Sequence, residues 1–255
     1  MDKTLTLRAH VEGADAMLCL NRLPLARIRD GQELKLAVHE YLMAGENQIE
    51  LQSLAKVDMC AHAIRAHLNI EIQKDRGSKV ITTPSSLHTV EQLIQPRERL
   101  PQQQILNALV SLPVKFPRWR FFDLMDAFAE HNDKLRLEDF VSDLLGSIEK
   151  KRVMEITPLF IARNKELALA YGLDASVLHR LFCDSLLSNV ESGNLASGCS
   201  DPEQWQFRRV GQSSMYALLN QDHEPLFQFH DPESNTVHQW PMLVAVLTGD
   251  VFVIR

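Results

Sequence analysis

The sequence predicts a two-domain protein, in which an N-terminal all-β sandwich precedes a C-terminal α+β domain with helices first and an antiparallel sheet after them. Short runs of period two fill the first 80 residues, and a period of three to four takes over beyond residue 117. All 11 Phe and all 3 Trp lie at or beyond Phe116, which indicates two separately built cores. We expect the sandwich over 1–82, a helix and linker over 83–116, and the α+β domain over 117–255.

The first domain is predicted from short runs that alternate apolar and polar residues, as half-buried strands do. In the first run Leu5, Leu7, Ala9 and Val11 fall on one side, so this side is expected to face the core. Gly, Asp and Asn residues separate the runs and mark turns. The predicted strands are 5–11, 16–21, 24–28, 33–38, 47–52 and 63–72.

The connecting segment is predicted to be helical at both ends. Ser86 suits the N-cap of a short helix that runs to Leu93. Residues 96–104 are rich in proline and charge and are expected to form a linker. A second short helix is expected over 105–112, with the sequence ILNALVSL.

The C-terminal domain is predicted from helical spacing and helix end signals. Pro117 suits the first turn of a helix, and Thr157-Pro158 and Asp174 begin two others. Gly172 and Gly193 supply the stops. The predicted helices cover 118–131, 137–148, 157–171 and 175–192, and the predicted strands cover 206–220, 225–231, 238–247 and 250–255.

Composition disfavours several classes of function. The formal net charge is −6 and the pI about 5.9, which argues against nucleic acid as a partner. No apolar run approaches the roughly 18 residues of a membrane span, and no secretory leader is recognised at the start. The four cysteines lack metal-binding spacing, so reduced thiols and a cytoplasmic location are expected, with a Cys183–Cys199 disulfide as the alternative. No cofactor or metal is expected.

One stretch of the first domain carries a family likeness. Gly45 can reverse the chain and Asn47 can hydrogen-bond to nearby backbone, so that Leu42 and Ile49 pack on one core. Together with Asn21, residues 42–49 (LMAGENQI) resemble β-sandwich accessory modules of the galactose-binding-like or immunoglobulin-like type. In that family Gly is usual where this chain has Arg22.

The resemblance implies a sandwich topology, and some such modules bind sugars. Sugar sites commonly use exposed aromatic faces, but Tyr41 is the single aromatic residue among the first 115. We therefore expect no sugar binding here. The strand edges could pair with another chain, so a homo-oligomer is compatible with the sequence.

The densest group of polar residues in the second half lies at 222–240. It could form a metal site or an acid–base pair, with His230, His238 and Asp231 as the catalytic candidates. The other reading is that these residues surround a DPESN turn at a sheet edge.

A pocket in the α+β domain is the further possibility. The ending WPMLVAVLTGDVFVIR resembles the last hairpin of NTF2-like domains, which implies a cavity between helices and a curved sheet. The residues expected to line it are Trp205, Tyr216, Phe227, Phe229, His238 and Trp240, with Asp123 or Asp126 facing in. The alternative is that the aromatic residues are simply core.

Two functions follow from these observations. The first is a non-catalytic cytoplasmic protein of bacterial type that acts through protein–protein contacts, in an accessory, adaptor or immunity-like role. The second is a small-molecule binder or hydrolase-like enzyme with a pocket in the α+β domain. The missing catalytic signatures favour the first: the chain has no Walker loop, GxGxxG, HExxH or GxSxG.

Overall fold

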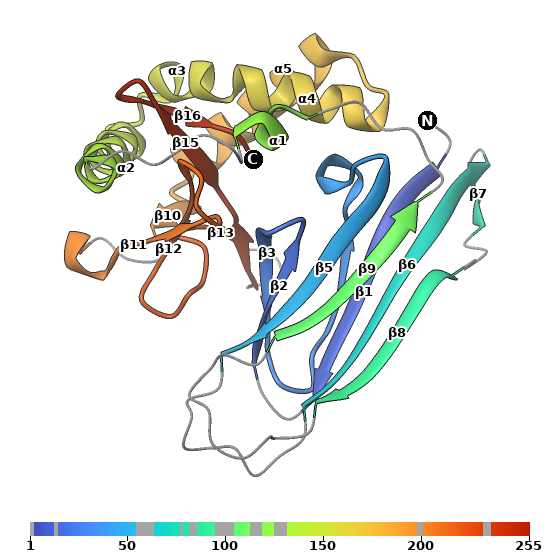
Figure 1. The fold of residues 1–255 in the computed structure, drawn as a ribbon. Coiled ribbons are helices and arrows are strands. Elements are labelled where there is room, and N and C mark those ends of the chain that lie inside the picture. The colour runs from blue at the N-terminus through green and yellow to red at the C-terminus, as the bar shows by residue number, and fades with distance from the viewer. Residues whose placement is uncertain are drawn as a thin grey trace. The chain divides into compact units, whose positions relative to one another are not determined.

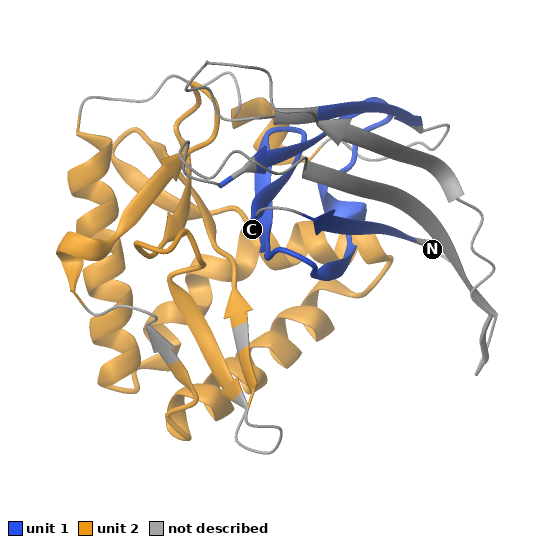
Figure 2. Cartoon of the chain, turned by 90° about the horizontal axis from the view of Figure 1, so that it is seen from below, with its two compact units in different colours: residues 1–118 blue, residues 119–255 orange. Residues whose placement is uncertain are grey.

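The computed structural model describes residues 3–12, 15–54, 64–76, 79–81, 86–94, 105–112, 119–124, 132–197, 201–231 and 236–255. The chain divides into two compact units, residues 1–118 and 119–255, which Figure 2 colours separately. Strands come first, then helices, then antiparallel sheets, as Figure 1 shows and as the sequence predicts. Among the described helices none is long and apolar enough to cross a membrane.

The first sheet of unit 1 is antiparallel, and β1 lies between β4 and β6. The order is β4-β1-β6-β7, and β8 also pairs with β6. Leu5, Leu7, Ala9 and Val11 are each at most 2% exposed, which confirms the predicted inward face. The strands are β1 (Lys3–Glu12), β4 (Glu33–Ala37), β6 (Ile64–Arg76), β7 (Lys79–Ile81) and β8 (Ser86–Ile94).

The second sheet of unit 1 has the order β3-β2-β5-β9. Its central strand β2 is buried along its whole length, and Leu18 and Leu20 pair with Leu51 and Ile49 of β5. The strands are β2 (Ala16–Leu20), β3 (Leu23–Ile28), β5 (Gly45–Ser53) and β9 (Ile105–Leu112), and a short 3-10 turn, η1 (His39–Tyr41), precedes β5.

The predicted helices over 86–93 and 105–112 are wrong. Residues 86–94 form β8, and residues 105–112 form β9, which pairs with β5 over eight residues. Pairing with a distant strand decides the conformation of β9, because its backbone groups gain partners that no local pattern reveals. The predicted linker at 96–104 lies outside the described residues.

Two buried asparagines join the turn after β2 to the loop before β5. The Asn47 side chain is fully buried, and its Oδ1 accepts from Asn21 Nδ2 at 2.9 Å and from Met43 N at 2.8 Å. Its Nδ2 donates to the carbonyl oxygens of Met43 and Gly45, at 2.9 and 3.1 Å. The predicted role of Asn47 in fixing this turn is confirmed, and Leu42 and Ile49 are both buried.

The turn between β2 and β3 should become more stable when Arg22 is replaced by glycine. Asn21 and Arg22 have φ of 51° and 69°, the left-handed pair of a type I′ hairpin turn, and Arg22 is exposed. A side chain costs about 1–2 kcal/mol in this region, while glycine loses roughly 0.5–1 kcal/mol of chain entropy. We expect Arg22→Gly to raise the free energy of unfolding by about 0.5–1 kcal/mol in urea titrations. A fall in stability would contradict this account of the turn.

Two helices of unit 2 end at the predicted glycines, and α5 also begins at its predicted cap. The predicted helix over 157–171 divides into η3 and α4, and α2 begins at Asp133, before the predicted 137. Pro117 and residues 125–131 of the first predicted helix lie outside the described residues. The side chain of Asp174 accepts hydrogen bonds from the amides of Ser176 and Val177, both at 2.9 Å, and so caps α5. Gly172 ends α4 with φ of 66°. The helices are α1 (Arg120–Leu124), α2 (Asp133–Glu149), α3 (Val153–Ile156), η3 (Thr157–Phe160), α4 (Ile161–Tyr171), α5 (Ala175–Glu191) and the short 3-10 helix η4 (Pro202–Gln204).

The described residues of unit 2 form two antiparallel sheets where the sequence predicts one. The orders are β10-β13-β14 and β11-β12-β15-β16. The predicted strand 238–247 breaks after Trp240, where Pro241 cannot donate to a ladder, and its halves join different sheets. The strands are β10 (Leu195–Ser197), β11 (Gln206–Arg209), β12 (Met215–Leu219), β13 (Phe227–Asp231), β14 (Thr236–Trp240), β15 (Leu243–Leu247) and β16 (Asp250–Val253).

The core of unit 2 forms between its helices and both sheets. One stripe of α2 is buried, as its spacing predicts: Leu137, Val141 and Leu144 are at most 2% exposed. Phe160 of η3 stacks on Trp240 of β14, with ring centroids 5.3 Å apart. These contacts hold η3 and the start of α4 in place beside the sheets.

Candidate functional site

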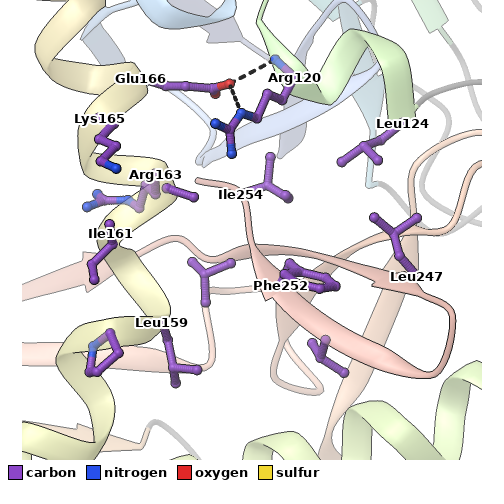
Figure 3. A pocket seen from close by; sticks show the side chains of 14 residues that line it. Arg120, Leu124, Leu159, Ile161, Arg163, Lys165, Glu166, Leu247, Phe252 and Ile254 are labelled. Atoms are coloured by element: carbon purple, nitrogen blue, oxygen red, sulfur yellow. Dashed lines mark hydrogen bonds and ion pairs between the residues drawn. The ribbon is translucent and has the colours of Figure 1, made fainter.

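An open groove of about 580 Å³ lies in unit 2, between the start of α4 and the last strand (Figure 3). We call it the α4–β16 groove. Its walls come from three parts of unit 2: residues of α1, the segment from Pro158 to Glu166, and the hairpin of β15 and β16 as far as Ile254. Its volume is in the range of about 300–1,000 Å³ that is usual for binding sites.

The groove has an apolar lining that remains open to solvent. Leu159, Ile161 and Phe252 are 36%, 40% and 47% exposed, although all three are large apolar side chains. Ile254 and Leu124 add to the same surface. Binding sites are usually lined by apolar side chains with a few polar groups among them.

The charged side chains of the groove are mostly cationic. Arg120, Arg163 and Lys165 line it with one carboxylate, Glu166, so the lining carries a formal charge of +2 (three minus one). The chain as a whole carries −6. Figure 3 shows Arg120 and Glu166 together at one end, with Leu159 and Phe252 toward the other. The groove therefore offers apolar surface next to positive charge.

Glu166 is held by two arginines from distant parts of the sequence. Its Oε2 lies 2.6 Å from Arg255 Nη1, while its Oε1 accepts from the Arg120 amide at 2.9 Å. The side chain of Arg255 is 3% exposed, and its guanidinium lies 5.0 Å from the centre of the Phe121 ring. This cluster fixes the relative positions of α1, α4 and the end of the last strand.

The four cations around the groove differ in how firmly they are held. Arg255 is buried against Glu166, and Arg163 lies over the rings of Phe160 and Phe182, at 5.9 and 5.4 Å. Arg120 is 66% exposed, and its Nε is 3.6 Å from Glu166. Lys165 is also exposed. Arg120 and Lys165 are thus the cations best placed to meet an anionic ligand.

The aromatic residues predicted to line a pocket lie in the core. Trp205, Tyr216 and Trp240 are each 7% exposed and Phe227 is fully buried, and Phe229 packs against the same cluster. None of these five is among the described residues that line the α4–β16 groove. Asp123 is exposed on α1, and Asp126 lies outside the described residues.

Tyr216 makes a buried contact with the first residue of α2. Its hydroxyl donates to Asp133 Oδ2 at 2.6 Å. Burial raises the pKa of the Tyr216 phenol, and the hydrogen bond and negative charge of Asp133 raise it further. The pair therefore joins α2 to β12 with a neutral phenol and a carboxylate.

Tyr216→Phe should lower the free energy of unfolding by about 2 kcal/mol near neutral pH, because the buried carboxylate of Asp133 loses a donor. A folded-state pKa above the unfolded value of about 10 means that the phenol's stabilising effect is complete below pH 10 and is lost as the pH rises above it. Urea unfolding from pH 8 to pH 11 should show a steeper loss in the wild type than in Tyr216→Phe. Parallel curves would contradict this role for the pair.

The predicted catalytic histidines are not brought together as opposed residues. His230 is exposed on β13, and the register pairs it with Val237, while His238 pairs with Phe229. The side chains of Asp231 and His238 lie outside the described ones, and no group of three metal-ligating side chains occurs in the described part of the chain.

A Cys–His–Asn line of contacts joins α4 to α5. Asn164 Nδ2 lies 3.0 Å from His179 Nδ1, and His179 Nε2 lies 3.6 Å from Cys183 Sγ. This order of side chains occurs in some nucleophilic enzymes. Here burial raises the pKa of the Cys183 thiol and Asp184 adds to the effect, so the reactive thiolate is disfavoured. Cys183 is a free thiol, and the line of contacts serves helix packing.

Residues at the start of unit 2 contribute to the groove through a contact between distant parts of the sequence. Trp119 is 1% exposed and belongs to the interior, while Arg120 pairs with Glu166, 46 residues further along the chain. Sequence reasoning missed Glu166 and Arg255. One signal was present: Arg255 continues the alternation of Val251 and Val253, so a cation occupied an inward position and required a buried partner.

Comparisons of the chain with protein-family models, curated proteins and solved structures gave no match. The resemblances of the two halves to sandwich accessory modules and to NTF2-like domains therefore stay predictions, and the function rests on the geometry of the α4–β16 groove.

Proposed function

We propose that the chain is a non-catalytic protein that acts through protein–protein contacts, in an accessory, adaptor or immunity-like role, and that unit 2 binds a segment of a partner protein in the α4–β16 groove. In this proposal the two sheets of unit 1 form a sandwich that serves as an accessory module. The observation that carries the proposal is the groove itself, where solvent-exposed Leu159, Ile161 and Phe252 lie beside cationic side chains.

The chemistry of the lining supports binding over catalysis. Among the described residues that line the groove there is no Ser, Cys, His, Tyr or Thr, and Glu166 is the one carboxylate. Two arginines already hold that carboxylate, so it is poorly suited to accept a proton from a substrate. Apolar anchors with arginine nearby are a common composition of protein-binding surfaces.

The openness of the groove supports a protein partner over a small ligand. Small-molecule sites typically bury about 70–90% of the ligand, which requires enclosing walls. Here the flanking side chains of Ile161 and Phe252 are themselves 40% and 47% exposed. A partner segment can cover them together with the rim, and so removes more apolar surface from water.

A display library of random peptides, selected on the full chain, tests the proposal. We expect peptides whose binding is lost in Ile161→Glu and kept in Leu181→Glu. Leu181 is 58% exposed on α5 and does not line the groove, so it is a matched control. Glutamate at the first position of α4 is compatible with the helix dipole, so Ile161→Glu should fold.

Two outcomes would contradict the proposal. Either no peptide is enriched, or the enriched peptides bind both variants equally well. The rival function is the binding of a small amphipathic acid. It gains support if the library yields no peptide whose binding depends on the groove, and if dodecanoate raises the melting temperature of the wild type but not that of Ile161→Glu.

A further inference from the structure

We propose that the α4–β16 groove is selective for an acidic segment of its partner, in which apolar side chains cover Ile161 and Phe252 and a neighbouring side-chain carboxylate is bound by Arg120 and Lys165. This inference rests on the proposed function and names the chemistry of the partner. Its basis is that the groove combines an apolar lining with a formal charge of +2, in a chain whose net charge is −6.

The first step of the argument is that the positive charge is not neutralised within the groove. Glu166 is the one carboxylate among the described lining residues, and its shortest contact, at 2.6 Å, is with Arg255. Glu166 thus divides its charge between Arg255, which does not line the groove, and Arg120, so it cannot balance the three lining cations. An anionic partner would supply the negative charge that the lining cations do not receive from Glu166.

The second step separates the cations that are held from those that can respond. The guanidinium of Arg163 lies over Phe160 and Phe182 and donates to Asn164 Oδ1 at 2.8 Å, so its position is fixed by packing. Arg120 is 66% exposed, and Lys165 is exposed on α4. The side chains of Arg120 and Lys165 can therefore reorient toward an incoming carboxylate without disturbing the packing of the core.

The third step concerns the distance from Arg120 to Glu166. The Arg120 Nε lies 3.6 Å from Glu166 Oε1, which is longer than a charge-assisted hydrogen bond of about 2.7–2.9 Å. The backbone amide of Arg120 holds the same oxygen at 2.9 Å. A partner carboxylate can thus pair with the Arg120 guanidinium while the amide keeps α1 attached to α4.

The fourth step places the apolar part of the partner. Figure 3 shows Ile254 below Arg120, with Phe252 and Leu159 further from the charged end. A segment that puts a carboxylate at Arg120 therefore has Ile254 and Phe252 next along the groove. The expected partner is acidic at one end of a short apolar stretch, rather than acidic throughout.

Fluorescence anisotropy with two labelled synthetic peptides tests the inference on the full chain. The acidic probe is a short stretch of leucine and valine with glutamates at one end, and the neutral probe carries glutamine in place of every glutamate. We expect the neutral probe to bind roughly ten-fold more weakly, which corresponds to about 1.4 kcal/mol, the order of one charge-assisted hydrogen bond. Lys165→Gln should remove most of this difference, while Lys150→Gln, at an exposed position outside the groove, should keep it.

The outcomes separate this inference from the proposed function. If peptides from the library bind in the groove but the two probes bind equally, the acidic selectivity is wrong and the proposed function stands. If Lys165→Gln and Lys150→Gln weaken the acidic probe to the same extent, the charge effect belongs to the whole surface and the inference is also wrong. If no peptide depends on Ile161, the proposed function fails first.

Discussion

Asn47→Ala is expected to lower the free energy of unfolding by about 4 kcal/mol. The fully buried Asn47 amide takes part in four hydrogen bonds, at 2.8–3.1 Å, with Asn21, Met43 and Gly45. Each such bond contributes about 1 kcal/mol, and alanine would also leave buried backbone groups without partners. Urea unfolding monitored by circular dichroism would measure the change.

The matched control for this variant is Asn107→Ala. Asn107 lies on β9, in the same sheet as Asn47, but its side chain is exposed, so we expect a change within about 0.5 kcal/mol. Equal effects of the two substitutions would show that the buried network has no special role. A further check is Asn47→Asp, which should be at least as damaging because a carboxylate cannot donate to the Met43 and Gly45 carbonyls.

Glu166→Ala is expected to lower the free energy of unfolding by about 3 kcal/mol. The side chains of Glu166 and Arg255 are 12% and 3% exposed, and their charged atoms are 2.6 Å apart. Removing one partner of a buried ion pair typically costs about 3–5 kcal/mol, because the other charge stays buried without compensation. Arg120 would also lose the acceptor of its backbone amide.

Glu138→Ala provides the control for this second variant. Glu138 forms an ion pair with Lys134 one turn away on α2, at 3.5 Å, and Lys134 is 78% exposed. An exposed pair of this kind contributes about 0.3–0.5 kcal/mol, so its loss should be barely measurable. If Glu166→Ala were equally mild, the cluster that joins α1, α4 and the last strand would not be what holds the groove together.

Local patterns were sufficient for the start of α5 and for the ends of α4 and α5, because these ends carry chemical signals. Asp174 accepts two backbone hydrogen bonds at the start of α5, and Gly172 and Gly193 take positive φ where α4 and α5 end. Local patterns failed for β9, where Ala108 and Val110 face the core but Leu109 is 59% exposed. Because this leucine lies on the outer face, apolar and polar residues do not alternate along the segment. The strand conformation is determined by pairing with β5, which is some 60 residues away in the sequence.

The candidate site was largely beyond sequence reasoning because its contacts are long-range. Arg120, Glu166 and Arg255 lie in three separate segments, and no local spacing connects them. The predicted aromatic residues did gather, with Phe227 and Trp240 in edge contact at 6.0 Å, but in the core. Composition can show that Trp and Phe will cluster, whereas it cannot show whether a cluster closes or leaves a cavity.

The most direct test of the central claim is an amide NMR titration of the full chain with a peptide selected for binding that depends on Ile161. The account predicts that the largest shifts fall on α1, on the segment from Pro158 to Glu166, and on β16, which together form the α4–β16 groove. Shifts confined to the strands of unit 1, or to the exposed face of α5 around Leu181, would contradict it.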